Sequence, residues 1–444
     1  MIFSAPRFVV VDDKVEHLNA IVKTFQELGT PCLGIHYKQE EGVEDKHFRG
    51  VRCLFMDLHL VNTQISTDYK LQYSTIAGIL EDVISKNGGP YVLVLWTEQS
   101  HACDGLRDYL NDNLDDEKPH VRPLAVISLS KETFITTVDG SIRDIDSLKK
   151  AVVAAINESP QLAALLSWES DVLKAAGDTL ASLLQLVPSE NRTVQSFSHA
   201  VDVLLSRLAQ ETVGLPHVEN NKRTGVTSAL APILIDRILN QEISPESNDV
   251  WSRAVTCHGK DLPAPSSFEA GSINRMLHVA IPGGESIRST DWGAVVAWPF
   301  AWSDEELSAH TSLSIKQLCC EEFKLRSSAI DACKAMLVRV GAVCDYAQDN
   351  RGPITYLLAV EVPVDAEKQA VKASDAIWQS PVFISPSRDV PVSLFVHIRF
   401  PFTLLKKDCE GWQAAYRIRE QLFMQLITSA SNYAARPGIV RLAI

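Results

Sequence analysis

The chain has 444 residues, of which 46% are hydrophobic and 22% charged, enough material for about two or three domains with buried cores. Its net charge of −13 argues against a nucleic-acid binder, which needs clustered Lys and Arg to neutralise phosphates. No apolar run reaches the roughly 18 residues of a membrane span, so we expect no membrane contact. The start lacks a signal-peptide pattern, and the nine Cys are scattered along the sequence. We therefore expect a cytoplasmic protein.

Residues 1–157 alternate short apolar runs with helical periods. Apolar runs rich in β-branched residues predict five strands, at 7–11, 32–37, 51–56, 91–96 and 123–128. Between and after them, apolar residues at helical spacing predict helices over 15–28, 71–85, 104–114 and 142–156. This alternation predicts an α/β fold, with a parallel sheet covered by helices on both faces.

Polar side chains follow the predicted strands at the points where the strands end. They are Asp12, Asp13, Asp57, Thr97 and Lys131. Ligands of open α/β sheets bind outside the carboxyl ends of the strands, so we expect these side chains to meet. Three carboxylates that meet would repel one another without a divalent cation, and oxygen ligands suit Mg²⁺. A hydroxyl and an ammonium beside that cation would bind the oxygens of a phosphoryl group.

This set resembles the receiver domain of bacterial response regulators over about the first third of the chain. The resemblance implies a flavodoxin-like fold with strand order 2-1-3-4-5. It also implies that Asp57 accepts a phosphoryl group from a partner histidine kinase. By the same resemblance, Mg²⁺ would be held by Asp12, Asp13, Asp57 and the backbone carbonyl of His59, while Thr97 and Lys131 would bind the phosphoryl oxygens.

The sequence departs from the receiver pattern around Lys131. Glu132 follows the lysine where receivers usually have Pro, and Ser128 stands where they usually have an aromatic switch residue. Phosphate chemistry can therefore persist without the usual coupling of threonine to an aromatic ring. Each of these residues also has a structural alternative, which stays open. Asp12 and Asp13 can cap a helix, Thr97 can cap the next helix, and Lys131 can be a surface charge. If all three alternatives hold, the chain is a pseudo-receiver that keeps the fold without the phosphate chemistry.

The remaining chain divides into residues 158–245, which are helical by period, and 246–444, a C-terminal α+β domain of unknown role. Helical faces include Val194, Phe197 and Val201, and breaks fall at 188–191 and 215–217. Residues 246–310 are rich in Ser, Pro and Gly, which predicts ordered irregular structure. Strands are predicted at 335–345, 354–363, 381–384, 391–399 and 439–444, and a helix is predicted over Trp412–Ile427.

Cys344 and Asp345 follow a predicted strand, and three interpretations stay open: Cys344 is a metal ligand, Cys344 is a thiolate nucleophile, or Cys344 is a buried residue beside a turn-forming Asp345. No signature of an output enzyme or of a helix-turn-helix is present, so we expect a phospho-acceptor and not an enzyme. In architecture the chain resembles the receiver-only component of Detocs-type anti-phage two-component systems, which implies a phosphate buffer. An effector protein or a second copy are further expected partners, and nucleic acid is not. The alternatives are an effector with an unrecognised C-terminal active site and a pseudo-receiver interaction protein.

Overall fold

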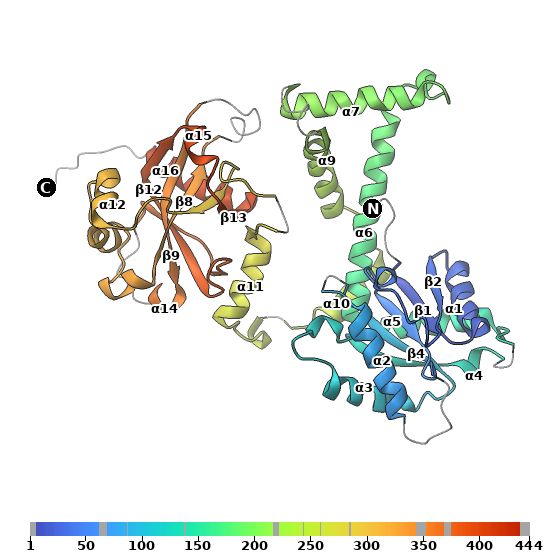
Figure 1. Cartoon of the computed structure of the whole chain (residues 1–444). Coiled ribbons are helices and arrows are strands. Elements are labelled where there is room, and N and C mark those ends of the chain that lie inside the picture. The colour runs from blue at the N-terminus through green and yellow to red at the C-terminus, as the bar shows by residue number, and fades with distance from the viewer. Residues whose placement is uncertain are drawn as a thin grey trace. The chain divides into compact units, whose positions relative to one another are not determined.

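The computed structural model divides into two compact units, of residues 1–186 with 232–261 and of residues 187–231 with 262–444 (Figure 1). The structure describes residues 6–61, 69–86, 88–136, 139–215, 222–242, 244–257, 259–283, 286–342, 352–367 and 374–435. None of the helices in these ranges is long and apolar enough to cross a membrane. The fold is α/β overall, with a parallel sheet in the first unit and an antiparallel sheet in the second.

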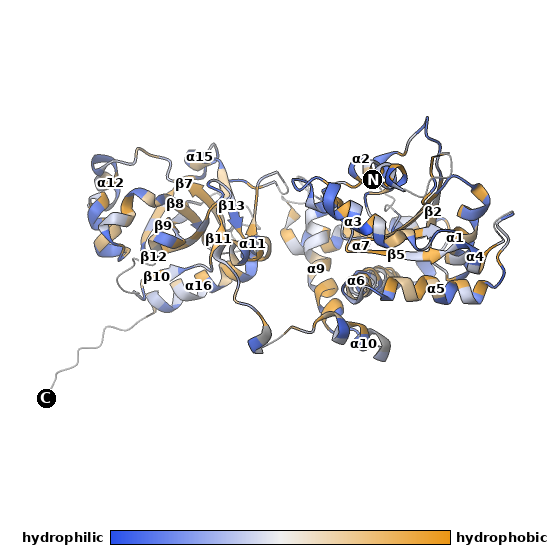
Figure 2. Cartoon of the chain, turned by 90° about the horizontal axis from the view of Figure 1, so that it is seen from below, coloured by the Kyte–Doolittle hydropathy of each residue, from blue (hydrophilic) through white to orange (hydrophobic). Residues whose placement is uncertain are grey.

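The first unit is built on a five-stranded parallel sheet of order β2-β1-β3-β4-β5, which confirms the predicted order 2-1-3-4-5. Its strands are β1 (Phe8–Asp12), β2 (Cys32–His36), β3 (Cys53–Met56), β4 (Val92–Thr97) and β5 (Ala125–Ser130). Every residue of β3 and β4 is buried. Such central strands of a parallel sheet read as continuous apolar runs, which is why the sequence pattern located them. The strands of both sheets are largely hydrophobic in Figure 2.

Helices cover the parallel sheet on both faces and make a separate hydrophobic core on each. One core contains buried residues of α2 and α3, and the other contains buried residues of α1 and α5. The helices are α1 (Val15–Glu27), α2 (Lys70–Val83), α3 (Ala102–Asn113), the single turn α4 (Lys131–Phe134) and α5 (Ile145–Asn157). Between β2 and β3 the described chain forms a 3₁₀ turn, Asp45–His47.

The long helix α6 (Pro160–Gln185) continues from α5, and its first turns belong to the core of the parallel sheet. Leu162 is fully buried in the core shared with α1 and α5. Farther along α6, the Glu169 carboxylate lies 3.4 Å from Arg7 Nη2 and 3.4 Å from Arg52 Nε, beside the amino ends of β1 and β3. Helix α10 (Pro245–Ala254) packs along α6, where Ser247 Oγ lies 3.0 Å from Ser167 Oγ. The compact first unit therefore extends past residue 157.

The burial of Leu162 predicts a large loss of stability for Leu162→Ala. Removing a fully buried leucine leaves a cavity, so we expect the free energy of unfolding to fall by about 2–5 kcal/mol. Urea unfolding followed by far-ultraviolet circular dichroism measures this loss. Leu165→Ala is the matched control, because Leu165 lies on the same helix but is 45% exposed. Equal stabilities of the two variants would contradict the placement of α6 in this core.

Two further helices follow α6 along the chain, α7 (Phe197–Val213) and α9 (Lys222–Leu239). The predicted break at 188–191 is a 3₁₀ turn, Ser189–Asn191, whereas Pro216 and His217 lie outside the described residues. The prediction that Val194 lies on a helical face is wrong, because α7 begins at Phe197 and Val194 is 98% exposed.

The second unit is built on an eight-stranded sheet of order β10-β12-β9-β8-β7-β13-β6, with β11 paired to β12, and all of its pairings are antiparallel. The strands are β6 (Val279–Ala280), β7 (Ala294–Ala297), β8 (Lys334–Val340), β9 (Ile354–Pro363), β10 (Ile377–Gln379), β11 (Phe383–Ile384), β12 (Pro391–Leu404) and β13 (Ala414–Ile418). Predicted strands correspond to β8, β9, β11 and β12. Strand β8 ends at Val340 and not at 345, while residues 439–444 lie outside the described chain.

The prediction of irregular structure over 246–310 is wrong in large part, because helices and strands occupy much of this range. Most of α10 falls there, with α11 (Ser267–His278), β6, β7 and α12 (Asp304–Thr311). Two serines of this stretch act as helix N-caps, and a serine just before it does the same. Ser244, Ser266 and Ser303 each accept a hydrogen bond from a backbone N–H in the first turn of the following helix. A composition typical of loops thus marked the beginnings of helices.

The prediction of one helix over Trp412–Ile427 is wrong in its first half. Residues Ala414–Ile418 form strand β13, and α16 begins only at Glu420 and ends at Ala434. Tyr416 and Ile418 are both buried because they alternate along the strand. The same apolar residues also match part of the spacing of a helix, which explains the wrong prediction. The other α-helices of the described residues are the short α14 (Val364–Glu367) and α15 (Lys406–Cys409). A π-helical turn at Gln317–Glu322 and a 3₁₀ turn at Ser327–Ala332 also belong to this unit.

Candidate metal site

The candidate site lies where β1 and β3 end at the carboxyl edge of the parallel sheet. Asp12 is the last residue of β1, and Asp57 directly follows β3. The two strands are neighbours in register, with Val11 opposite Met56, and the backbone N–H of Asp57 donates to the Val11 carbonyl at 3.0 Å. Strand pairing therefore places the residues that follow Val11 and Met56 side by side.

Three carboxylates converge at this edge. Oxygen atoms of Asp12, Asp13 and Asp57 all lie within 4.8 Å of one another, as the ligands of one cation would. Asp12 is fully buried and Asp57 is 5% exposed, whereas Asp13 is half-buried. Asp12 Oδ1 accepts a hydrogen bond of 2.9 Å from the backbone N–H of Lys14, which holds its carboxylate at the start of the loop after β1.

Lys131 is the counter-charge of this cluster. Its Nζ atom lies 2.8 Å from Asp12 Oδ2 and 3.0 Å from Asp57 Oδ2. Its side chain is 2% exposed, and the residue begins α4 directly after β5. A buried ammonium is stable only when it is paired, so the two carboxylates and the lysine depend on one another. The alternative that Lys131 is a solvent-exposed surface charge is therefore wrong.

The acidic pair after β1 does not cap a helix through its side chains. Lys14 is the N-cap residue of α1, and no side chain caps the first turn of that helix. Asp13 instead has a buried Oδ1 atom with no hydrogen-bond partner among the described residues. Buried carboxylate oxygens normally have a partner, and one without a protein donor suits a metal ligand.

Two of the three carboxyl groups, those of Asp12 and Asp13, have raised pKa values. Burial raises the pKa of Asp12 from 3.8 to about 7, against the opposing effect of Lys131, and the charge of Asp57 raises it further. Burial likewise raises the pKa of Asp13, with the charge of Asp57 as a second cause. When ionised, three carboxylates and one ammonium leave two negative charges in a partly buried space. A divalent cation would balance this charge, so the residues fit Mg²⁺ with Asp12, Asp13 and Asp57 as its side-chain ligands.

Thr97 lies at the same edge of the sheet but has another local role. It is the fully buried last residue of β4, paired with Ser130 just before Lys131. Its hydroxyl oxygen accepts a hydrogen bond of 3.1 Å from the backbone N–H of Gln99, in the turn that precedes α3. The neighbouring N–H therefore orients the hydroxyl. The alternative that Thr97 caps the next helix is wrong, because α3 begins at Ala102 and its N-cap residue is His101. The predicted contact of Thr97 with a phosphoryl oxygen stays a prediction.

Aromatic and imidazole side chains from the segments that follow β3 and β4 contact one another, and no motif in the sequence predicts these contacts. The Tyr69 hydroxyl donates to Gln99 Oε1 at 3.4 Å and lies 3.4 Å from His101 Nε2. The exposed ring of His59 lies 6.1 Å from that of Tyr69. The predicted role of the His59 backbone carbonyl as a metal ligand stays a prediction. These residues are far apart in sequence, so only the fold brings them together.

The raised pKa of Asp12 predicts a pH-dependent effect of Mg²⁺. Because the folded protein binds this proton more tightly than the unfolded chain, the stability that Asp12 contributes is full below pH 3.8 and is lost as the pH rises through about 7. Mg²⁺ competes with the same proton, so it stabilises the protein more where Asp12 is ionised. We expect the midpoint of thermal unfolding to rise more on adding Mg²⁺ at about pH 8 than at about pH 6.

The matched control for this measurement is Asp12→Asn, which cannot ionise at this position. We expect the variant to lose most of the response to Mg²⁺ and its dependence on pH. Removing the cation with a chelator should reverse the stabilisation of the unchanged protein. An equal response of the protein and the variant would show that Mg²⁺ binds elsewhere.

No family model, curated protein or solved structure matches this chain. The parallel sheet of order β2-β1-β3-β4-β5 and the acidic cluster at its carboxyl edge are receiver-like.

Proposed function

We propose that the chain is a response-regulator-like signalling protein that accepts a phosphoryl group on Asp57. The observation that carries this proposal is the convergence of the Asp12, Asp13 and Asp57 carboxylates with the buried Lys131 ammonium at the carboxyl edge of the sheet. Phosphoryl transfer depends mainly on positioning and charge stabilisation, and this arrangement supplies both.

In the proposed reaction an Asp57 oxygen attacks phosphorus, and the phosphorus–nitrogen bond of a phosphohistidine breaks. The imidazole leaves with the electron pair of that bond, and Asp57 becomes an acyl phosphate. Lys131, already 3.0 Å from Asp57 Oδ2, is placed to pair with a phosphoryl oxygen. Mg²⁺ held by Asp12, Asp13, Asp57 and the His59 carbonyl would neutralise charge on the transferred group. Thr97 would bind another phosphoryl oxygen.

The partner that fits this chemistry is a histidine kinase. We further propose that the protein acts as a phosphate acceptor or buffer and not as an enzyme, in line with its resemblance to the receiver-only component of anti-phage two-component systems. An effector protein or a second copy of the chain are the further partners of this proposal. Cys344 and Asp345, on which the alternative of a C-terminal enzyme partly rested, lie outside the described residues. The close approach of Lys131 to two carboxylates favours a working pocket over a pseudo-receiver.

Acetyl phosphate tests the proposal without a cognate kinase. Incubation with Mg²⁺ should add one phosphoryl group per chain, measured as the mass of the intact protein. An acyl phosphate is lost in mild base and on hydroxylamine treatment, whereas a serine or threonine ester survives hydroxylamine. No addition from acetyl phosphate or from a panel of phosphorylated kinases would identify a pseudo-receiver.

A further inference from the structure

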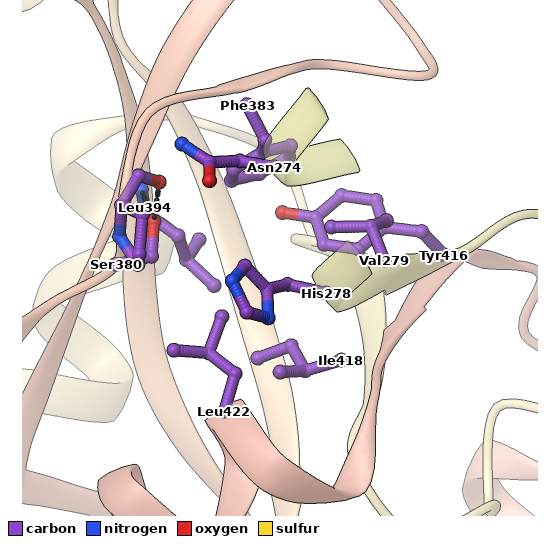
Figure 3. A pocket seen from close by; sticks show the side chains of 10 residues that line it. Asn274, His278, Val279, Ser380, Phe383, Leu394, Tyr416, Ile418 and Leu422 are labelled. Atoms are coloured by element: carbon purple, nitrogen blue, oxygen red, sulfur yellow. Dashed lines mark hydrogen bonds between the residues drawn. The ribbon is translucent and has the colours of Figure 1, made fainter. Parts of the chain in front are cut away.

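The second unit contains a small cavity beneath helix α11, lined mainly by apolar side chains of β12, β13 and α16 (Figure 3). The space open to the centre of a water molecule is about 10 Å³, which is room for one water. Tyr416 points its hydroxyl into the cavity, and that hydroxyl lies next to the buried carboxyl of Glu361. A cavity of this size does not admit a substrate or a cofactor, and we assign no chemistry to it.

In the first unit, His36 borders the loop that carries two of the candidate metal ligands. It is the last residue of β2 and lies opposite Asp12 in the parallel pairing of β1 with β2. Just beyond it, the backbone N–H of Tyr37 donates to the Asp12 carbonyl at 2.9 Å. The end of β2 therefore runs alongside Asp12 and the residue that follows it, although no motif in the sequence assigns a role to His36.

The His36 ring makes a hydrogen bond to this loop. Its Nε2 atom lies 2.9 Å from the backbone carbonyl oxygen of Asp13, which is 23 positions away in the sequence. A carbonyl oxygen can only accept, so Nε2 carries the hydrogen and donates it. An imidazole can donate in its neutral form, whereas a lysine or an arginine in the same place would add a charge that repels a cation. The contact therefore holds the loop without requiring a positive charge beside the site.

Asp13 is the candidate ligand that depends most on such a contact. Asp12 is part of strand β1, and the N–H of Asp57 donates to the Val11 carbonyl at 3.0 Å, so the sheet fixes both residues. Asp13 follows the end of β1, and it is half-buried. Its Oδ1 atom is buried without a hydrogen-bond partner among the described residues. A bond that holds the Asp13 peptide group against β2 limits the rotation of the backbone at Asp13, and with it the direction of the carboxylate.

We propose that His36 is a positioning residue of the cation site, whose Nε2–H bond to the Asp13 carbonyl holds the Asp13 carboxylate beside those of Asp12 and Asp57. Removing a group that orients a ligand without touching the metal typically changes metal affinity about 10–100-fold. His36 is exposed and bonds to the backbone of the ligand residue, so we expect the lower end of this range. This role rests on the cation site of the proposed function and does not depend on the transfer of a phosphoryl group.

Binding of Mn²⁺ to the full chain tests this role, because the carboxylate ligands that suit Mg²⁺ also suit Mn²⁺. Electron paramagnetic resonance measures the free ion, whose signal falls as the ion binds, and Mg²⁺ should compete for the same site. At about pH 8 we expect His36→Phe, which keeps a planar ring without the donor, to weaken Mn²⁺ binding about tenfold. His36→Gln returns an N–H donor and should restore most of the affinity. His120→Phe, in the 3₁₀ turn Pro119–Val121 before β5, is the control and should bind like the unchanged protein.

The Asp12→Asn variant shows whether the cation site itself exists, and we expect it to bind Mn²⁺ no longer. If it fails to bind while His36→Phe binds as tightly as the unchanged protein, the site stands and the role of His36 is refuted. Equal losses in His36→Phe and His36→Gln would also refute this role, because the N–H donor would then not be what matters. Undiminished binding in Asp12→Asn would overturn the cation site and the role of His36 together. His36 is exposed, so its replacement leaves the core intact, and circular dichroism with a chelator present checks the fold of each variant.

Discussion

Replacement of Asp57 by Asn is expected to abolish phosphorylation by acetyl phosphate. An amide oxygen is a poor nucleophile, and the variant keeps the size of the side chain in a position that is 5% exposed. Oxygen atoms of Asp12 and Asp13 lie within 4.8 Å of an Asp57 oxygen, but Asp12 is fully buried and paired with Lys131. We therefore expect no substitute acceptor, and the mass of the intact protein should stay unchanged after incubation.

The control for this variant is Asp104→Asn, an exposed carboxylate on α3 of the same unit. It should be phosphorylated to the same extent as the unchanged protein. Circular dichroism shows whether the Asp57 variant keeps its fold. Labelling of Asp57→Asn at undiminished stoichiometry would place the acceptor on another residue.

Replacement of Lys131 by Ala is expected to have the largest effect on stability. It leaves Asp12 and Asp57 buried without their counter-charge, and breaking a buried ion pair from one side costs about 3–5 kcal/mol. We expect this loss in the free energy of unfolding at about pH 8 without a divalent cation, which is above the pKa of about 7 of Asp12. Chemical denaturation with a chelator present measures it.

Mg²⁺ should restore most of the stability lost in Lys131→Ala, because the cation supplies positive charge to the same carboxylates. Its affinity should be kept or increased, since the ammonium repels the cation. The phosphorylated state should still be impaired, because the lysine is expected to contact phosphate. Lys150→Ala, at an exposed position of α5, is the control. Loss of Mg²⁺ affinity in Lys131→Ala would contradict the proposed roles.

The sequence predicted the parallel sheet well because its strands are buried on both faces. Residues such as Val92 to Trp96 form continuous apolar runs, and four of the five runs are followed by a polar residue that the fold places at one edge of the sheet. The order of these residues along the chain was enough to predict that they meet. It could not show that Lys131 pairs with Asp12 as well as Asp57, since that depends on side-chain geometry across β5, β4, β3 and β1.

The antiparallel unit was harder to predict because its signals are short and mixed. Tyr416 and Ile418 fit both a strand and the helix expected over Trp412–Ile427, and only pairing with β7 decides between them. The contact of Tyr416 with Glu361 joins residues more than fifty positions apart, without a motif at either one. Serines near 244, 266 and 303 suggested loops, although each caps a helix.

The most direct test of the central claim is a crystal structure of the full chain with Mg²⁺ and beryllofluoride, a mimic of the phosphoryl group. We predict one Mg²⁺ bound by Asp12, Asp13 and Asp57, with beryllium attached to an Asp57 oxygen and a fluorine in contact with Lys131 Nζ. A structure grown under these conditions with Asp57 unmodified and Lys131 still paired with Asp12 in the absence of a cation would contradict the account.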